Sequence, residues 1–185
     1  MKWNNHSDLD GQHAFLSASK YHWINYDDDK LIFMYKTAMA AEQGTILHAL
    51  ASDLIKNRRE LKDETSTLGM FVRDCIHYNM RSEQVVKYSE NAFGTADAIS
   101  FNGKTLRIFD LKTGTIKAHM EQLMIYAAYF CLEYGKDPRK IDIDLRIYQN
   151  DDIELCDPPK EAIIQIMETT RRFSRTIDKL KEENT

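Results

Sequence analysis

Residues 94–126 read GTADAISFNGKTLRIFDLKTGTIKAHMEQLMIY and determine the expected fold. Asn102-Gly103 separates two runs of alternating side chains, and this dipeptide is typical of a two-residue β-hairpin turn because both positions require positive φ. Such a turn predicts paired residues whose numbers sum to 205, so that Asp97 faces Ile108. A helix is expected after the second strand.

Alternation along the two strands predicts which side chains share a face of this hairpin. One face is expected to be apolar near the turn and charged at the far end, with Phe101, Ile99, Asp97, Leu106, Ile108, Asp110 and Lys112. The opposite face is expected to be mostly apolar, with Ala96, Ala98, Ser100, Phe109 and Leu111. A hairpin with two apolar faces is buried, and buried acids require a cation or several hydrogen-bond donors to compensate them.

Asp97 and Asp110 become diagonal neighbours in this register, about 7–8 Å apart at the backbone. Carboxylates that reach toward each other from this separation can share a divalent cation. Lys112 lies one step beyond Asp110. The alternative is a surface hairpin with an ordinary aspartate–lysine ion pair.

Several short motifs together resemble the PD-(D/E)XK nuclease superfamily, specifically its RecB-like branch. They are Gly94-x-x-Asp97, Asp110-x-Lys112 and Gln122-Leu-Met-Ile-Tyr126, with Ala96 where the superfamily name has proline. Gly44-Thr-Ile-Leu-His48 resembles the histidine-bearing upstream helix of that branch, and LSASKYHWINY at residues 16–26 is similar to the start of phage-encoded relatives. The matches follow the family order over about residues 15–130.

The resemblance implies a fold and a set of site residues. The fold is α/β (α+β), a restriction-endonuclease-like core with a central mixed β-sheet flanked by helices and an N-terminal helical part. One or two Mg²⁺ or Mn²⁺ ions would be held by His48, Asp97, Asp110 and the carbonyl of Leu111. The implied catalytic residues are Asp97, Asp110, Lys112, Gln122 and Tyr126, and those implied to contact substrate are Thr113, Gln122 and Tyr126.

The implied activity is metal-dependent hydrolysis of DNA that leaves a 5′-phosphate, by an exonuclease rather than an endonuclease, in phage-type recombination, repair or degradation. Such a protein would work in the cytoplasm of a bacterial host, with DNA, further copies of itself or a single-strand-annealing recombination protein as partners. The alternative function is a catalytically silent nuclease fold that binds DNA or protein.

Composition agrees with a single domain over residues 1–185, with residues 1–14 flexible. The chain is 43% hydrophobic and 29% charged, no segment reaches the roughly 20 apolar residues of a membrane span, and the polar start does not resemble a signal peptide. The net charge of −4 argues against non-specific coating of nucleic acid. Cys75, Cys131 and Cys156 are too few for a four-cysteine iron–sulphur cluster and lack the spacing of a zinc site.

Alternatives stay open for individual residues. His48 read from periodicity alone is a packed helix residue, and Gln122 with Tyr126 could be a buried polar pair. Glu90 is considered as an additional ligand. Basic strips that could contact DNA are Lys56, Arg58 and Arg59, and Arg171, Arg172, Arg175 and Lys179, for which solvated helix faces are the alternative.

The remaining elements follow from periodicity and from turn residues. Expected helices cover about residues 17–26, 37–62, 68–80, from 116–118 onward, and 158–183. Expected strands outside the hairpin cover about residues 84–89 and 141–148, the second at or near a sheet edge. The acidic run at residues 27–29 is expected to be a solvated turn.

Overall fold

The computed structural model describes residues 4–114 and 116–183, in two compact units that meet at Gly44 and are treated separately here. Whether they behave as one domain in solution stays a prediction. The first unit contains the 3-10 helices η1 (Ser7–Leu9) and η2 (Ala18–Asn25) and the start of helix α1 (Asp28–Lys56). None of its described residues is buried. Of the segment 1–14 expected to be flexible, residues 1–3 lie outside the described part.

Helix α1 begins at Asp28, not near Thr37 as expected, because the acidic run is its N-terminus. The Asp27 carboxylate accepts a hydrogen bond from the Lys30 N–H at 2.8 Å, and Asp28 and Asp29 lie in the first turn. Negative charge at this end is favourable because it opposes the positive end of the helix dipole. The acidic run is exposed to solvent, as predicted, but it begins a helix where a turn was expected.

The second unit is built on a five-stranded mixed sheet in the order β1-β2-β3-β4-β5. Only the β3–β4 pair is parallel, and the other neighbours are antiparallel. The strands are β1 (Arg81–Ser89), β2 (Ala92–Phe101), β3 (Thr105–Leu111), β4 (Asp142–Gln149) and β5 (Asp152–Cys156). The short edge strand β5 was not expected, and it places β4 one position inside the edge.

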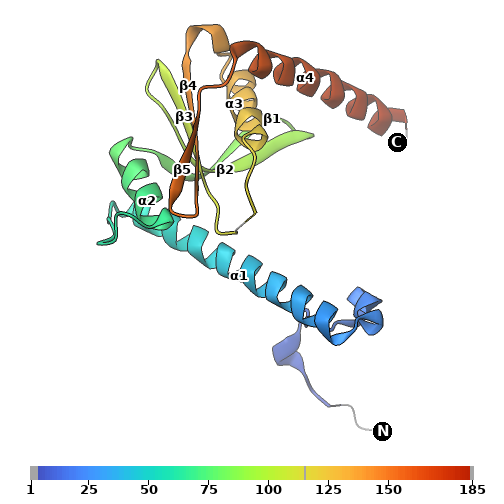
Figure 1. Cartoon of the computed structure of the whole chain (residues 1–185). Coiled ribbons are helices and arrows are strands. Elements are labelled where there is room, and N and C mark those ends of the chain that lie inside the picture. Colours follow the sequence, from blue (N-terminus) through green and yellow to red (C-terminus); the bar gives the residue numbers. More distant parts are fainter. Residues whose placement is uncertain (1–3, 115, 184–185) are drawn as a thin grey trace. The chain divides into compact units, whose positions relative to one another are not determined.

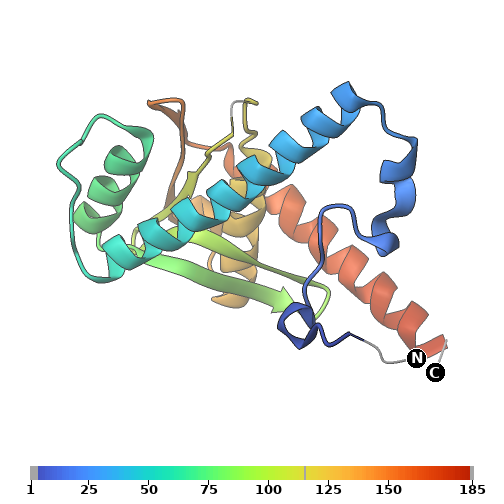
Figure 2. The same cartoon turned by 90° about the horizontal axis from the view of Figure 1, so that it is seen from below.

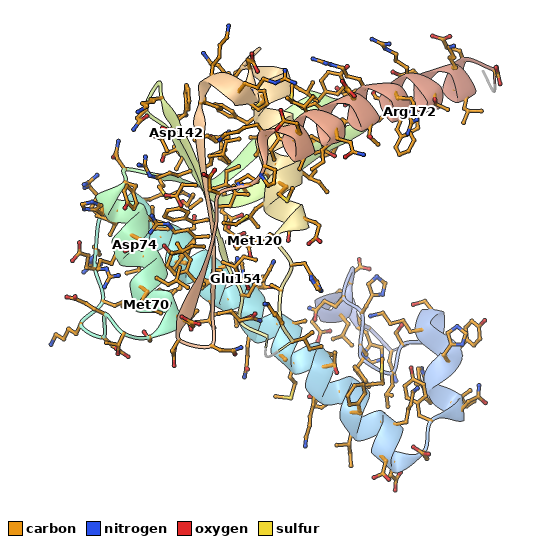
Figure 3. All side chains as sticks on the ribbon, turned by 45° about the horizontal axis from the view of Figure 1, so that its top comes forward. Met70, Asp74, Met120, Asp142, Glu154 and Arg172 are labelled. Carbon is orange, nitrogen blue, oxygen red and sulfur yellow. The ribbon has the colours of Figure 1, made fainter. Side chains whose placement is uncertain are left out.

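Helices cover both faces of this sheet (Figures 1 and 2). Helix α2 (Thr67–His77) and the second half of α1 pack on one face, while α3 (Glu121–Glu133) and α4 (Lys160–Glu183) pack on the other. In Figure 3, Asp74 on α2 and Met120 just before α3 mark the two sides. The short 3-10 helix η3 (Pro138–Lys140) precedes β4. This α+β architecture with a mixed sheet, flanking helices and an N-terminal helical part confirms the predicted fold class.

Two cores lie on the two faces of the sheet. The core under α3 and α4 contains Ile99, Leu106, Ile108, Leu123, Leu145 and Ile163. The core under α1 and α2 contains Ala51, Phe71, Val72, Ala98, Phe109, Leu111 and Tyr148. Near the turn, the predicted faces of the hairpin are therefore correct.

The predicted register of the hairpin was wrong by two. Phe101 pairs with Leu106, so paired numbers sum to 207. The Asn102 side chain accepts hydrogen bonds from the N–H groups of Lys104 and Thr105 at 3.0 and 2.7 Å, and of the Asn-Gly pair only Gly103 has positive φ, at 93°. This side-chain turn replaces the tighter type I′ turn. Since the shift is even, alternation still assigns most residues to the predicted faces.

Alternation fails at Asp97, where the two faces were expected to stay separate. Ala98 belongs to the core under α1 and α2, whereas Ala96 belongs to the core under α3 and α4. On β1, the position opposite Asp97 is Glu83, whose φ is 50°. The β1–β2 ladder is thus irregular on both strands at Glu83 and Asp97. The prediction that Asp97 and Ile99 share a face of the sheet was wrong.

Other boundaries differ by a few residues. Helix α1 ends at Lys56, where the expected helix continued to Lys62, because Arg58 adopts φ 52° and the Arg59 N–H closes back on the Leu54 carbonyl. Helix α3 begins at Glu121, and Thr115 of the preceding turn lies outside the described residues. Within the described part of the chain, no helix has the length and apolarity to cross a membrane.

Candidate functional site

One face of α1 supplies the first wall of the site. Gly44, His48 and Ser52 are spaced by four residues and so lie along one side of the helix. A Cβ at Gly44 would come within 2.8 Å of the Thr113 hydroxyl, so glycine permits the loop after β3 to approach the helix. One turn beyond His48, the Ser52 hydroxyl lies 2.9 Å from that of Ser82 on β1.

His48 points at Asp97. Its Nδ1 lies 3.3 Å from Asp97 Oδ2, and the same carboxylate oxygen accepts the N–H of Leu111 at 2.9 Å. The assigned β2–β3 ladder ends at Ala98 and Phe109. The Asp97 side chain therefore takes over as acceptor where the two strands stop pairing, and this contact holds the carboxylate between β2 and β3.

Glu83, which the sequence did not indicate as a ligand, joins His48 and Asp97 in a group of three potential metal ligands. Ligand atoms of His48, Glu83 and Asp97 all lie within 4.8 Å of one another. Glu83 reaches them from β1, at the irregular position opposite Asp97. In the sequence, Glu83 is one acidic residue in an expected strand. Only the pairing register of β1 with β2 brings it opposite Asp97, and the periodicity of the sequence does not determine that register.

Asp110 and Lys112 form the second part of the site, from the end of β3. Asp110 is only 4% exposed, and Lys112 Nζ lies 3.1 Å from its Oδ1 and 3.0 Å from its Oδ2. The Oδ2 atom is buried and, among the described residues, has no hydrogen bond of acceptable geometry. The pair thus leaves one buried carboxylate oxygen with the capacity to accept another contact.

Helix α3 positions the lysine. Lys112 Nζ donates to Gln122 Oε1 at 3.2 Å, and Gln122 Nε2 donates to the Tyr126 hydroxyl at 3.2 Å. The Tyr126 ring lies against β2, since a Cβ at Gly94 would come within 2.8 Å of its Cε1 atom. The predicted Gln–Tyr face of this helix therefore does meet the predicted lysine.

The electrostatics of the site favour a bound cation. Burial, followed by repulsion from Asp97, raises the pKa of Asp110 above its ordinary value. Burial and then Asp97 also raise the pKa of Glu83. The pKa of His48 is raised chiefly by its hydrogen bond to Asp97. Three carboxylates thus concentrate negative charge around one imidazole, and a nearby positive charge would lower the free energy of all three ionised groups.

The structure brings together most of the residues expected at the site, from both faces of the sheet. Asp97 contacts the α1 side through His48, while Asp110 and Lys112 contact the α3 side through Gln122. The Leu111 side chain is buried in the core, and exposed Thr113 lies beside Gly44. Glu90, which was considered as a further ligand, is instead an exposed turn residue paired with Lys87.

The comparisons with known proteins give one match. A family described as "Protein of unknown function (DUF2800)" is similar to residues 73–150. This stretch contains β1 to β4 and α3, and hence Glu83, Asp97, Asp110 and Lys112, but not His48. No curated protein and no solved structure matches the chain.

Proposed function

We propose that this protein is a Mg²⁺- or Mn²⁺-dependent deoxyribonuclease of the PD-(D/E)XK type. The observation that carries the proposal is the adjacency of two groups of side chains, one from α1, β1 and β2 and the other from the end of β3. The imidazole and carboxylates of His48, Glu83 and Asp97 form a potential ligand set. Beside it, buried Asp110 is paired with Lys112. Acidic ligands can hold the metal ion for phosphodiester hydrolysis, and a nearby ammonium can stabilise negative charge on the phosphate.

The donor set fits a small divalent cation. Carboxylate oxygens are the usual ligands of Mg²⁺ and Mn²⁺, and one imidazole is compatible with Mn²⁺. The buried Asp110 Oδ2 lies 3.0 Å from the Lys112 ammonium without an acceptable hydrogen bond in the described part of the chain, and a cation could bind this oxygen as well. Asp97 would bind the ion from a position between His48 and Asp110, because its carboxylate contacts His48 Nδ1 and accepts the N–H of Leu111, the residue after Asp110. One or two ions could be held in this way.

A bound ion would lower the pKa of a coordinated water and neutralise charge on the phosphate. The chain's own residues would do the rest. The Lys112 ammonium, released from part of its pairing with Asp110, would orient the water and contact a non-bridging oxygen of the scissile phosphate. Gln122 would keep that ammonium in position, and Tyr126 would in turn hold Gln122 through its hydroxyl.

The experiment is digestion of linear and circular DNA with Mg²⁺ or Mn²⁺, comparing the wild-type chain with Lys112→Ala. Lys104→Ala is a matched control, because Lys104 lies on the same hairpin, its side chain is 83% exposed, and its ammonium lies 3.6 Å from Asp142, outside the site. We expect Lys112→Ala to abolish cleavage and Lys104→Ala to leave it unchanged. Equal digestion by the wild type and Lys112→Ala would refute the assignment of Lys112.

The substrates in this assay also separate the finer alternatives. Digestion of linear DNA alone supports an exonuclease, which we favour, while nicking of circles supports an endonuclease. DNA binding without cleavage under all metal conditions would support the silent binding module instead. Mass spectrometry of the products should find 5′-phosphates.

The biological setting that we propose follows from the resemblance. We assign the activity to phage-type DNA recombination, repair or degradation in the cytoplasm of a bacterial host. With a net charge of −4, the chain would gain affinity for DNA from further copies of itself or from a single-strand-annealing partner.

A further inference from the structure

An aromatic stripe on α3 leads away from the candidate site. Gln122 is followed at intervals of four residues by Tyr126, Phe130 and Tyr134, so each side chain lies near the next one on the adjacent turn, and the row turns about 40° around the helix at each step. The first two contact Lys112 and the backbone at Gly94. Over the twelve residues to Tyr134, a helix rises roughly 18 Å. The stripe therefore connects the lysine with a second region of the same face of the sheet.

That second region contains a cavity of about 560 Å³ between β1, β2 and the end of α3. Phe101, Phe130 and Tyr134 form its aromatic side, with ring centroids 5.2 Å apart for the first pair and 4.7 Å for the second. The Tyr134 side is open, because this residue is 52% exposed. The volume lies within the range of about 300–1,000 Å³ that small-molecule sites occupy.

Polar groups complete the lining in a way that suits a nucleotide. Arg81 on β1 and Lys136 after α3 are exposed cations at the cavity, and Lys136 Nζ lies 5.5 Å from the centre of the Phe101 ring.

We propose that this cavity binds an unpaired base of a DNA strand whose backbone passes the Lys112 site. Tyr134 would stack on the base, and Arg81 and Lys136 would contact the adjoining phosphates. Aromatic platforms beside cations are the usual means of binding single strands, because every base has a π-face. The inference rests on the proposed nuclease function, and it specifies a single-stranded end as the preferred substrate.

The test is fluorescence anisotropy with a labelled oligothymidylate of 12 nucleotides and a blunt 12-base-pair duplex, in EDTA so that no cleavage occurs. Tyr134→Ala should weaken single-strand binding about 5- to 150-fold, the range for loss of one stacked base. Tyr134→Phe, which keeps the ring, should bind nearly as the wild type does. Phe173→Ala is the matched control, because Phe173 is another exposed aromatic residue, 55% exposed, on α4 and outside this cavity.

The outcomes separate this inference from the proposed function. Selective loss of single-strand affinity in Tyr134→Ala, with duplex affinity unchanged, supports the cavity assignment even if no cleavage is found. Equal single-strand affinities of the wild type and Tyr134→Ala overturn it, even if Lys112-dependent cleavage is found. An equal loss in Phe173→Ala also overturns it, because the effect would then not belong to the cavity. Failure of the wild type to bind the single strand overturns the cavity assignment, while the proposed function is still decided by the digestion assay with Lys112→Ala.

Discussion

Replacing Asp110 by asparagine should have opposite effects on stability without and with a divalent cation. Asparagine has nearly the same shape but carries no charge. Asp110 is only 4% exposed, and its Oδ2 lacks an acceptable hydrogen bond within the described residues. Its raised pKa means that the folded environment, with Lys112 included, disfavours the ionised form. Without metal, Asp110→Asn should therefore be more stable than the wild type.

The sign of this effect can be followed through pH. Below the ordinary pKa of 3.8 the carboxyl is protonated in both states and carries no penalty. As pH rises from 3.8 to the raised folded pKa, the unfolded chain ionises first, and the wild type loses about 1.4 kcal/mol of stability per pH unit. The penalty is complete above the folded pKa. The advantage of Asp110→Asn should accordingly grow over this interval and be constant at neutral pH.

A bound cation should reverse the order. A ligand that binds only the folded state at 100 times its dissociation constant stabilises that state by about 2.7 kcal/mol. For a chain of this length, that corresponds to an increase of about 5–11 °C in Tm. Asp110→Asn, which has lost one carboxylate ligand, should show much less of this increase.

Differential scanning calorimetry at pH 7, in EDTA and in Mn²⁺, measures both effects. Asp142→Asn is the control, because Asp142 is a largely exposed aspartate on the neighbouring strand β4 and lies outside the site. It should change Tm little in either buffer and should keep the Mn²⁺ increase. The reasoning is refuted if Asp110→Asn melts below the wild type in EDTA, or if Mn²⁺ raises its Tm as much as that of the wild type.

Two further predictions concern other parts of the site. The fold raises the pKa of His48, and only the neutral imidazole binds metal. Mn²⁺ affinity measured by calorimetry should therefore increase as pH rises through that pKa, and His48→Gln should flatten this dependence. A flat profile in the wild type would argue against His48 as a ligand. Gly94→Ala would place a methyl group 2.8 Å from the Tyr126 ring and should lower the free energy of unfolding in urea by about 1–3 kcal/mol. Tyr126→Ala should remove most of that cost in the double variant, and strictly additive costs would show that the two positions are not in contact.

The architecture was predictable because it follows from local patterns. Alternation in the hairpin and in Ile143, Leu145 and Ile147 of β4 indicates strands, and the apolar stripe of α4 indicates a packed helix. The predicted two-residue turn was too short, because the Asn102 side chain accepts hydrogen bonds from two backbone N–H groups and the loop is longer. Periodicity is insensitive to this error, since a register shift of two leaves every side chain on its face.

The site was only partly predictable, because it lies where the regular pattern breaks. The motif spacing indicated Asp110, Lys112, Gln122 and Tyr126, which do contact one another in sequence order. Asp97 was assigned to the wrong face, because a side chain that accepts the Leu111 N–H has left the alternation of its strand. Glu83 was missed for the same reason, as its positive φ has no signature in a strand sequence.

The most direct test of the central claim is anomalous diffraction from a crystal of this protein soaked in Mn²⁺. The account predicts a peak within coordination distance of the Asp97 carboxylate, with further ligands from His48, Glu83 or Asp110, and predicts that Lys112 Nζ moves from Asp110 toward open solvent. A fully occupied Mn²⁺ elsewhere, with the site empty and the Asp110–Lys112 pair unchanged, would contradict it.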